Sequence, residues 1–179
     1  SLGNEQDYNT QLTKIKATDA EAIFVPAYYQ KVSYVLKQSK EAGITLPYFG
    51  CDGWDGVLKQ LGNDAALANG AQFLTPFVAN DPNADIQKFV TAYKAKYNAD
   101  PDQFAADAYD AVYIVKAALE KAGCTGDMTA PEICDAIVGV MTSLSVDGLT
   151  GKAMTWNAEG EVSKAPLAAV IENGEYVMK

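Results

Sequence analysis

Histidine is absent from the 179 residues of this chain. Without it, the Ser–His and Cys–His pairs that activate protein nucleophiles cannot form, and the usual imidazole ligands of zinc are missing. Cysteine is scarce as well. The three cysteines show no C-x-x-C spacing, which argues against a thioredoxin-type redox site and against a zinc knuckle. We therefore expect neither a metal ion nor any other cofactor.

Basic residues are outnumbered, with 14 Lys and Arg against 23 Asp and Glu, which gives a formal net charge of −9. A surface of that sign repels phosphate backbones and anionic membrane faces, so we expect no nucleic acid as a partner. Long apolar runs are lacking too, and none approaches the roughly 20 residues that a membrane span needs. The first residues show no signal peptide, which a processed chain would have lost.

Two of the cysteines, Cys124 and Cys134, flank a short loop and the start of a predicted helix. They form a disulfide if the chain is secreted, and the alternative of two separate thiols is equally open at this point. Cys51 ends an apolar strand, where a small buried side chain is the expected role.

The most informative stretch is 22–56, which reads AIFVPAYYQKVSYVLKQSKEAGITLPYFGCDGWDG. Its first residues, 22–25, form an apolar run that predicts a buried strand, and a second strand is predicted over 46–51. Between them, Val32, Val35 and Leu36 lie on one face of a predicted helix that Gly43 ends. A strand, a helix and a strand at this spacing form a βαβ unit, so the two strands lie parallel in one sheet.

Both strands of this unit end at the same edge of the sheet, and each end carries unusual residues. Tyr28 and Tyr29 follow the first strand, while Asp52 and Trp54 follow the second. In open α/β sheets, ligands bind outside the carboxyl ends of the strands. Aromatic faces and a carboxylate that converge there predict a pocket for a small molecule with a positive charge.

The rest of the chain predicts further helices and strands around this unit. Two consecutive helices interrupt the alternation of strand and helix, which indicates a different layer or lobe. The C-terminal part is rich in strands, with Asn-Gly between two of them as a hairpin signal. Helices are predicted over 4–18 and 55–61, after Asp81-Pro82, after Asp100-Pro101 and after Thr129, and strands over 70–77, 151–156, 165–171 and 176–178, with a polar turn over 62–64.

Four segments in this order carry a resemblance to a known family: IFVPAYY, YFGCDGWDG, DPNADIQKFVTAYKAKYNADPDQFAADAYDAVYIVKAALEKAG and LTGKAMTWNAEGE. They are similar to the solute-binding proteins of bacterial ABC importers, and most of all to the leucine/isoleucine/valine-binding group of type I periplasmic binding proteins. The resemblance covers nearly the whole chain, but only the C-terminal half of such a protein. It implies an α/β fold with a parallel sheet flanked by helices, in two lobes that close on a ligand.

By this resemblance, residues 1–75 and 157–179 belong to the C-terminal, ligand-binding lobe. Residues 76–156 are then the last part of the N-terminal lobe, together with crossing strands. The earlier part of that lobe has no counterpart here, and the late helices have wide apolar faces. We therefore expect that the chain alone is not a working receptor and that it self-associates.

The resemblance also assigns roles to single residues. Tyr28 matches the family's cleft tyrosine, and Asp52 matches the acidic residue that receives the ligand's ammonium group. Phe104 matches an aromatic residue that contacts the ligand from the other lobe, and Trp54 is a near neighbour of the site. Each residue also has a structural interpretation: Asp52 as a turn residue, and Trp54 and Phe104 as packing residues. Asp107 and Asp110 are interpreted as a solvated or linker-facing edge.

The resemblance favours a non-enzymatic function: the substrate-binding component of an ABC importer, which binds a branched-chain amino acid or a similar amine-bearing solute and docks on the importer's permease. Such a protein is periplasmic or extracellular, and in some cases lipid-anchored. One alternative is an effector-sensing domain of a regulator or receptor, because the same fold serves in signalling. A weaker alternative is a hydrolase that uses Asp52 and Asp55 as a carboxylate pair, which a tight turn between them disfavours.

Overall fold

The computed structural model describes residues 5–179, which divide into two units. The first unit comprises the described residues up to Asp81 together with Leu167–Lys179, and the second comprises Pro82–Pro166. The sequence predicts boundaries at 75 and 157, whereas the chain leaves the first unit after Asp81 and re-enters it at Leu167, about six and ten residues later. As a result, the short hairpin near residue 160 belongs to the second unit.

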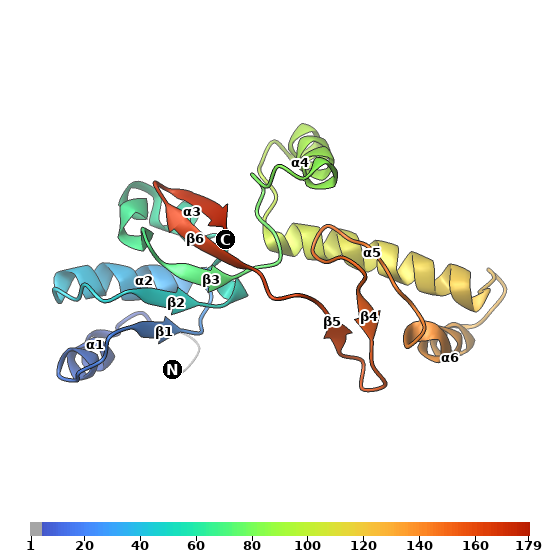
Figure 1. Ribbon diagram of the computed structural model, residues 1–179, viewed down its shortest axis with the longest axis horizontal. Helices are drawn as coiled ribbons and strands as arrows, with labels where there is room; N and C mark the ends of the chain where they lie inside the picture. The colour runs from blue at the N-terminus through green and yellow to red at the C-terminus, as the bar shows by residue number, and fades with distance from the viewer. Residues whose placement is uncertain (1–4) are drawn as a thin grey trace. The chain divides into compact units, whose positions relative to one another are not determined.

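The first unit is a five-stranded sheet with helices packed against one face (Figure 1). Its strand order is β1-β2-β3-β6-β7, in which β1, β2 and β3 run parallel and β6 and β7 are antiparallel to their neighbours. In chain order, its elements are α1 (Asn9–Lys16), β1 (Ile23–Val25), α2 (Tyr29–Glu41), β2 (Tyr48–Gly50), η1 (Asp52–Trp54), α3 (Val57–Leu61), η2 (Gly62–Ala68), β3 (Gln72–Leu74), β6 (Ala168–Glu172) and β7 (Glu175–Met178).

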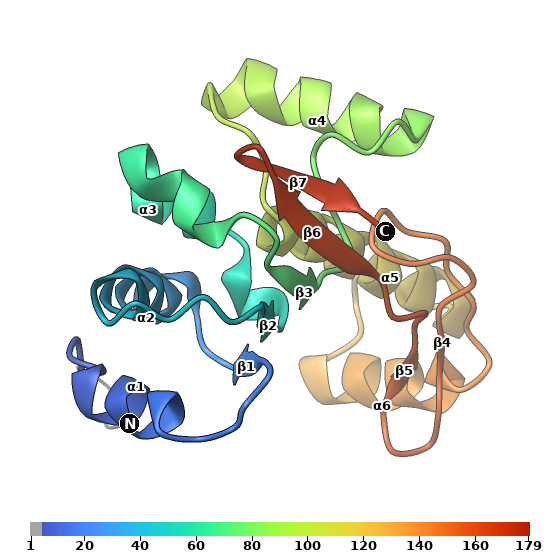
Figure 2. The same ribbon diagram turned by 60° about the vertical axis from the view of Figure 1, so that its left-hand side comes forward.

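The predicted βαβ unit is confirmed. Strands β1 and β2 pair in parallel with Ile23 opposite Tyr48 and Val25 opposite Gly50, and α2 connects them. The helix buries Val32, Val35 and Leu36 against the sheet, as their spacing predicts. Helices α1, α2 and α3 lie along the same side of the sheet in Figure 2, and a single apolar core fills the space between.

The C-terminal hairpin is also confirmed. Asn173 and Gly174 both have positive φ, 52° and 80°, which is the backbone that a two-residue turn between antiparallel strands needs. Two predictions need correction. The polar turn expected at 62–64 is the start of the 3₁₀ helix η2, and the helix expected over 4–18 is the shorter α1. The beginning of that predicted helix, Asn4, lies outside the described residues.

The second unit consists mainly of helices. Its elements are α4 (Ala84–Tyr97), α5 (Gln103–Ala122), α6 (Ala130–Met141), β4 (Thr155–Trp156) and β5 (Val162–Ser163). The predicted helix starts hold. Asp102 accepts a hydrogen bond from Ala105 N at 2.9 Å, and a Glu132 carboxylate oxygen accepts one from Thr129 N at 2.7 Å. For α4 the capping residue is Asn83, whose side chain accepts from the N–H of Asp85.

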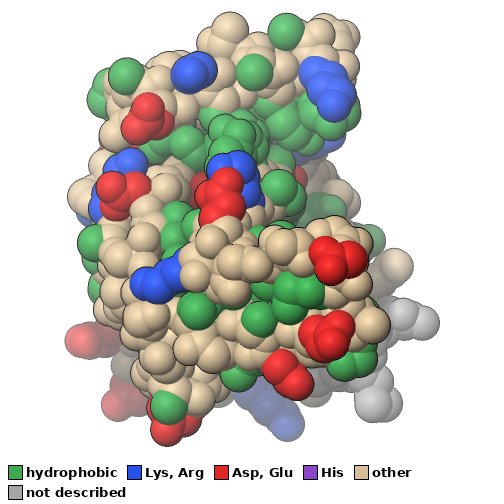
Figure 3. Space-filling model, turned by 90° about the vertical axis from the view of Figure 1, so that its right-hand side faces the viewer, with side chains coloured by type: hydrophobic (Ala, Val, Ile, Leu, Met, Phe, Trp, Pro, Cys, Tyr) green, Lys and Arg blue, Asp and Glu red, His purple; other side chains and the backbone are tan. Residues whose placement is uncertain are grey.

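Apolar side chains stay at the surface of this unit. Val112 on α5 is 67% exposed and Val138 on α6 is 66% exposed. The space-filling view from this side shows hydrophobic side chains among the acidic ones (Figure 3). None of the helices in the described part of the chain is both long and apolar enough to cross a bilayer.

Candidate functional site

The predicted site lies at the carboxyl ends of β1 and β2, in the first unit. The chain leaves β1 through Pro26 and Ala27, and Tyr28 is the extended N-cap residue from which α2 starts. It leaves β2 through Cys51 into the 3₁₀ turn that begins at Asp52. Because β1 and β2 are parallel neighbours, the two exits lie at the same edge of the sheet.

Gly53 brings these two exits into contact. A Cβ atom at Gly53 would lie 2.9 Å from the carbonyl oxygen of Ala27 and 3.2 Å from the Cα of Tyr28. Only glycine allows the turn after β2 to approach the backbone after β1 so closely. The turn that begins at Asp52 therefore contacts the backbone that leads from β1 into Tyr28.

Both predicted ligand residues of this edge face solvent. Tyr28 and Asp52 are exposed, whereas Asp55, three positions further on, is buried. An exposed carboxylate beside an exposed phenol ring can accept hydrogen bonds from an ammonium group and can cover an apolar or cationic ligand. The different burial of Asp52 and Asp55 gives no support to a pair of carboxylates that face a common substrate.

The prediction that Trp54 contacts the ligand needs correction, because its side chain is 0% exposed and lies in the core. The indole covers Gly50, where an added Cβ would lie 2.1 Å from Nε1. Its Nε1–H donates to the carbonyl oxygen of Val25 at 2.9 Å, and its ring stacks on Phe73 with centroids 6.4 Å apart. Trp54 thus ties the end of β1 to the turn that carries Asp52, which is the packing role that sequence reasoning left open.

Phe104 belongs to the second unit, where it is the second residue of α5 and partly exposed. Its contact with a ligand stays a prediction.

The predicted disulfide is not formed: Cys124 and Cys134, both within the described residues, are free thiols. Cys134 lies on an exposed position of α6, and Cys124 is held at the end of α5 by the hydrogen bond from its N–H to Leu119 O at 3.1 Å. The alternative of two separate thiols is the one that the structure has. Cys51 is half-buried rather than fully buried.

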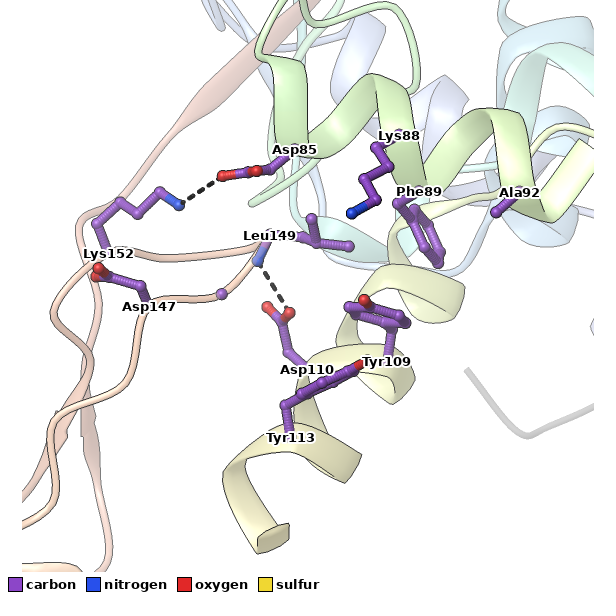
Figure 4. A pocket seen from close by; sticks show the side chains of 11 residues that line it. Asp85, Lys88, Phe89, Ala92, Tyr109, Asp110, Tyr113, Asp147, Leu149 and Lys152 are labelled. Atoms are coloured by element: carbon purple, nitrogen blue, oxygen red, sulfur yellow. Dashed lines mark hydrogen bonds and ion pairs between the residues drawn. The ribbon is translucent and has the colours of Figure 1, made fainter. Parts of the chain in front are cut away.

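A cavity of about 410 Å³ lies elsewhere, within the second unit, between α4, α5 and the loop 147–152 (Figure 4). Its walls include the rings of Phe89 and Tyr109, whose centroids are 5.0 Å apart, and the side chain of Tyr113. A hydrogen bond with Tyr113 raises the pKa of Tyr109. None of the ligand residues predicted from the sequence lines this cavity. Asp85 and Lys152, which line one side of it, form an ion pair at 3.7 Å.

Asp110 beside this cavity corrects another prediction. It is buried rather than solvated, and its two carboxylate oxygens accept hydrogen bonds from Leu149 N at 2.9 Å, Thr150 N at 2.8 Å and Thr150 Oγ1 at 2.7 Å. A Cβ at Gly148 would lie 2.4 Å from Asp110 Oδ2. The glycines that flank Leu149 and Thr150 are a sequence signal for a close contact at this loop. The sequence does not indicate which acidic residue accepts the hydrogen bonds from Leu149 and Thr150.

Among residues 5–179, no group of three or more His, Cys, Asp or Glu side chains is positioned to hold a metal ion. The edge formed by Tyr28 and Asp52 offers hydrogen-bond acceptors and an aromatic face, so its chemistry is that of binding.

Comparison with known proteins agrees with a binding role. A family model described as "Periplasmic binding protein" matches residues 1–175. A curated relative, the leucine-, isoleucine-, valine-, threonine- and alanine-binding protein of Pseudomonas aeruginosa, is 27% identical over 121 residues, which are 66% of this chain and 31% of that protein.

Solved structures are similar over the whole chain. The branched-chain amino acid transporter substrate binding protein LivJ of Streptococcus pneumoniae, in complex with isoleucine, is 30% identical with a TM-score of 0.78, and covers 100% of this chain and 51% of its own. A leucine binding protein of Thermotoga maritima, 24% identical with a TM-score of 0.79, shares the fold over 98% of this chain and 48% of its own. This chain thus spans about half the length of these solved structures. It belongs to the periplasmic binding protein family, whose type I α/β fold it has in part, and whose members bind solutes and are not enzymes.

Proposed function

We propose that this chain is part of the substrate-binding component of an ABC importer and that it contributes one side of a site for a branched-chain amino acid or a similar amine-bearing solute. The observation that carries the proposal is the contact of Gly53 with the backbone of Ala27 and Tyr28, together with the exposure of Tyr28 and Asp52 at this edge of the sheet. The 30% identity to an isoleucine-bound substrate binding protein supports the ligand class.

In this proposal, Asp52 accepts hydrogen bonds from the ligand's ammonium group, and the ring of Tyr28 covers the ligand from the same side. A charge-assisted hydrogen bond of this kind is about twice as strong as a neutral one. Phe104 contacts the apolar side chain of the ligand.

The proposal also names partners and a location. A protein of this function delivers its solute to an importer permease, in the periplasm or at the outer cell surface, where a lipid anchor holds some such proteins. We further propose that the chain self-associates, and the exposure of Val112 and Val138 supports this expectation.

The test is isoleucine binding by the full-length protein that contains this chain and by its Asp52→Asn variant, measured by isothermal titration calorimetry. Loss of one partner of a desolvated charge pair costs about 2–5 kcal/mol, so we expect affinity to fall at least tenfold. Asp19→Asn is the matched control, because this exposed carboxylate lies before β1, at the opposite end of the strand. Equal affinities of wild type and Asp52→Asn would overturn the assignment.

A further inference from the structure

The cavity of about 410 Å³ in the second unit plays no part in the proposed function, and one of its walls is aromatic. The rings of Phe89 and Tyr109 lie with centroids 5.0 Å apart and planes 55° apart, and the centroids of Tyr109 and Tyr113 are 4.7 Å apart. Leu149 lies on the opposite wall. Small-molecule sites have volumes of about 300–1,000 Å³. The cavity therefore has the size and the lining to take an apolar ring.

Hydrogen bonds within the unit hold both walls in place. The hydrogen bond between the two phenols raises the pKa of Tyr109, which identifies Tyr109 as the donor and Tyr113 as the acceptor, because donation stabilises the neutral phenol. On the opposite wall, Leu149 N donates to Asp110 at 2.9 Å. The cavity is therefore largely preformed, as small-molecule sites usually are.

The three carboxylates that line the cavity each have a partner. Asp110 accepts three hydrogen bonds from the loop, and Asp147 accepts one from Ala153 N at 2.7 Å. Asp85 pairs with Lys152 at 3.7 Å. The carboxylate of Asp147 also points away from the rings in Figure 4. These contacts offset the negative charge around the cavity, so the site is not one that selects a cation.

Lys88 is the charged residue of the cavity that has no such partner. Among residues 5–179, its ammonium group has no ion-pair partner. Figure 4 shows its side chain pointing from α4 across the cavity, toward Leu149 and Tyr109. An ammonium group in this position attracts an anion, and the aromatic wall favours an anion that itself carries a ring.

We propose that this cavity is a ligand site of its own, for a small aromatic carboxylate. The ring of the ligand packs against Phe89 and Tyr109, and its carboxylate accepts a hydrogen bond from Lys88 Nζ. The cavity lies within the second unit and shares no residue with the edge that carries Tyr28 and Asp52. The site is therefore additional to the proposed solute-binding function and does not depend on it.

The experiment measures the binding of phenylacetate to the full-length protein that contains this chain, by isothermal titration calorimetry. We expect saturable one-to-one binding with a dissociation constant of about 1 mM or below. The uncharged 2-phenylethanol and the ringless acetate should each bind at least about tenfold more weakly. Phenylacetate should bind equally well with and without excess isoleucine, because the two sites share no residue.

Substitutions test the two parts of the site separately. Lys88→Gln should weaken phenylacetate binding about tenfold or more, and Lys88→Arg, which keeps the charge, should bind nearly as wild type does. Phe89→Leu keeps apolar volume but removes the ring, and should weaken binding by a factor of about 2–10. Lys96→Gln is the matched control and should bind as wild type does, because Lys96 is an exposed lysine of the same helix that does not line the cavity.

Three outcomes would overturn the proposal: a dissociation constant above about 1 mM, equal binding by wild type and Lys88→Gln, or competition by isoleucine. Competition would place the aromatic acid at the edge that carries Tyr28 and Asp52. Isoleucine binding by Lys88→Gln is measured in parallel and should equal that of wild type. A failure of this site is thereby distinguished from a failure of the proposed solute-binding function.

Discussion

The two units of this chain are held together in different ways. In the first, one apolar core joins the helices to the sheet, and it includes large side chains such as Trp54, Phe73 and Leu36. In the second, the longest helix buries only small or polar side chains: Gln103, Ala106, Asp110 and Ala118. α6 buries none of its residues.

Polar contacts add to the stability of the second unit, whose helices α5 and α6 bury no large apolar side chain. Asp110 accepts three hydrogen bonds from Leu149 and Thr150, and Lys164 donates to Thr150 Oγ1 at 2.7 Å while lying 3.4 Å from Asp107. A few contacts in the N-terminal half of α5 fix the loop 147–152, whereas Val112 and Val115 further along the helix stay exposed. The first unit therefore depends on one large apolar core, whereas the second combines directed hydrogen bonds with a smaller set of buried apolar side chains, Ile86, Val90, Leu144 and Met154.

The largest effect should come from the core of the first unit. Trp54→Ala removes a fully buried indole, and truncation of a buried Trp costs about 3–5 kcal/mol of unfolding free energy. It also removes the Nε1–H bond to Val25, so the turn that carries Asp52 should loosen. Urea unfolding, monitored by hydrogen exchange, should show the loss of unfolding free energy in the amides of the first unit only.

Trp156→Ala is the control, because this half-buried Trp lies in the short strand β4 of the second unit. Loss of protection in the second unit on Trp54→Ala would contradict the division into two separately stabilised units.

A smaller loss, confined to the second unit, should follow Asp110→Asn. The amide that replaces the carboxylate keeps one acceptor but turns an NH₂ group toward the donors of Leu149 and Thr150, which leaves one of them unsatisfied in a buried place. We expect a cost of about 2–4 kcal/mol. Hydrogen exchange at residues 147–152 measures this loss of stability.

Asp135→Asn, at an exposed position of α6, is the matched control and should be neutral. If Asp110→Asn were equally neutral, the hydrogen bonds of Asp110 could not contribute to the stability of the second unit.

The apolar periodicity of the first unit made its fold predictable. Val32, Val35 and Leu36 identified α2, and the apolar run before Pro26 identified β1, because both patterns follow from burial on one face. The Asn173-Gly174 turn was predictable for a different reason: its backbone needs positive φ at both positions. The second unit was predictable only at its helix starts, where capping is local in sequence.

Contacts between residues distant in sequence were not predictable in the same way. The contact of Asp110 with Thr150 spans 40 residues, and nothing in its own segment distinguishes Asp110 from the less buried Asp107. Trp54 was left open between site and core for the same reason: its role depends on Gly50 beneath it and Val25 on the neighbouring strand. The meeting of the two strand exits that carry Tyr28 and Asp52 could be predicted, because parallel strands end at one edge.

The smallest effect should come from a polar contact inside the apolar first unit. The hydroxyl oxygen of Tyr176 accepts hydrogen bonds from Gly56 N at 3.1 Å and Leu58 N at 3.2 Å, and burial raises the pKa of Tyr176 to about 12, from an ordinary value of 10.0. Tyr176→Phe leaves these two N–H groups without that acceptor, at a cost of about 1–3 kcal/mol near neutral pH. The pKa of Tyr176 is higher in the folded state, so as pH rises the unfolded chain loses the phenol proton first. The stability due to Tyr176 is therefore complete below pH 10.0 and falls by about 1.4 kcal/mol per pH unit up to about pH 12.

Urea unfolding at pH 9 and pH 11, monitored by tryptophan fluorescence, should therefore show a difference in unfolding free energy between wild type and Tyr176→Phe that is smaller at pH 11. Tyr28→Phe, at an exposed phenol, should track wild type at both pH values; a gap that stays constant would mean that Tyr176 ionises in the folded unit as readily as in the unfolded chain.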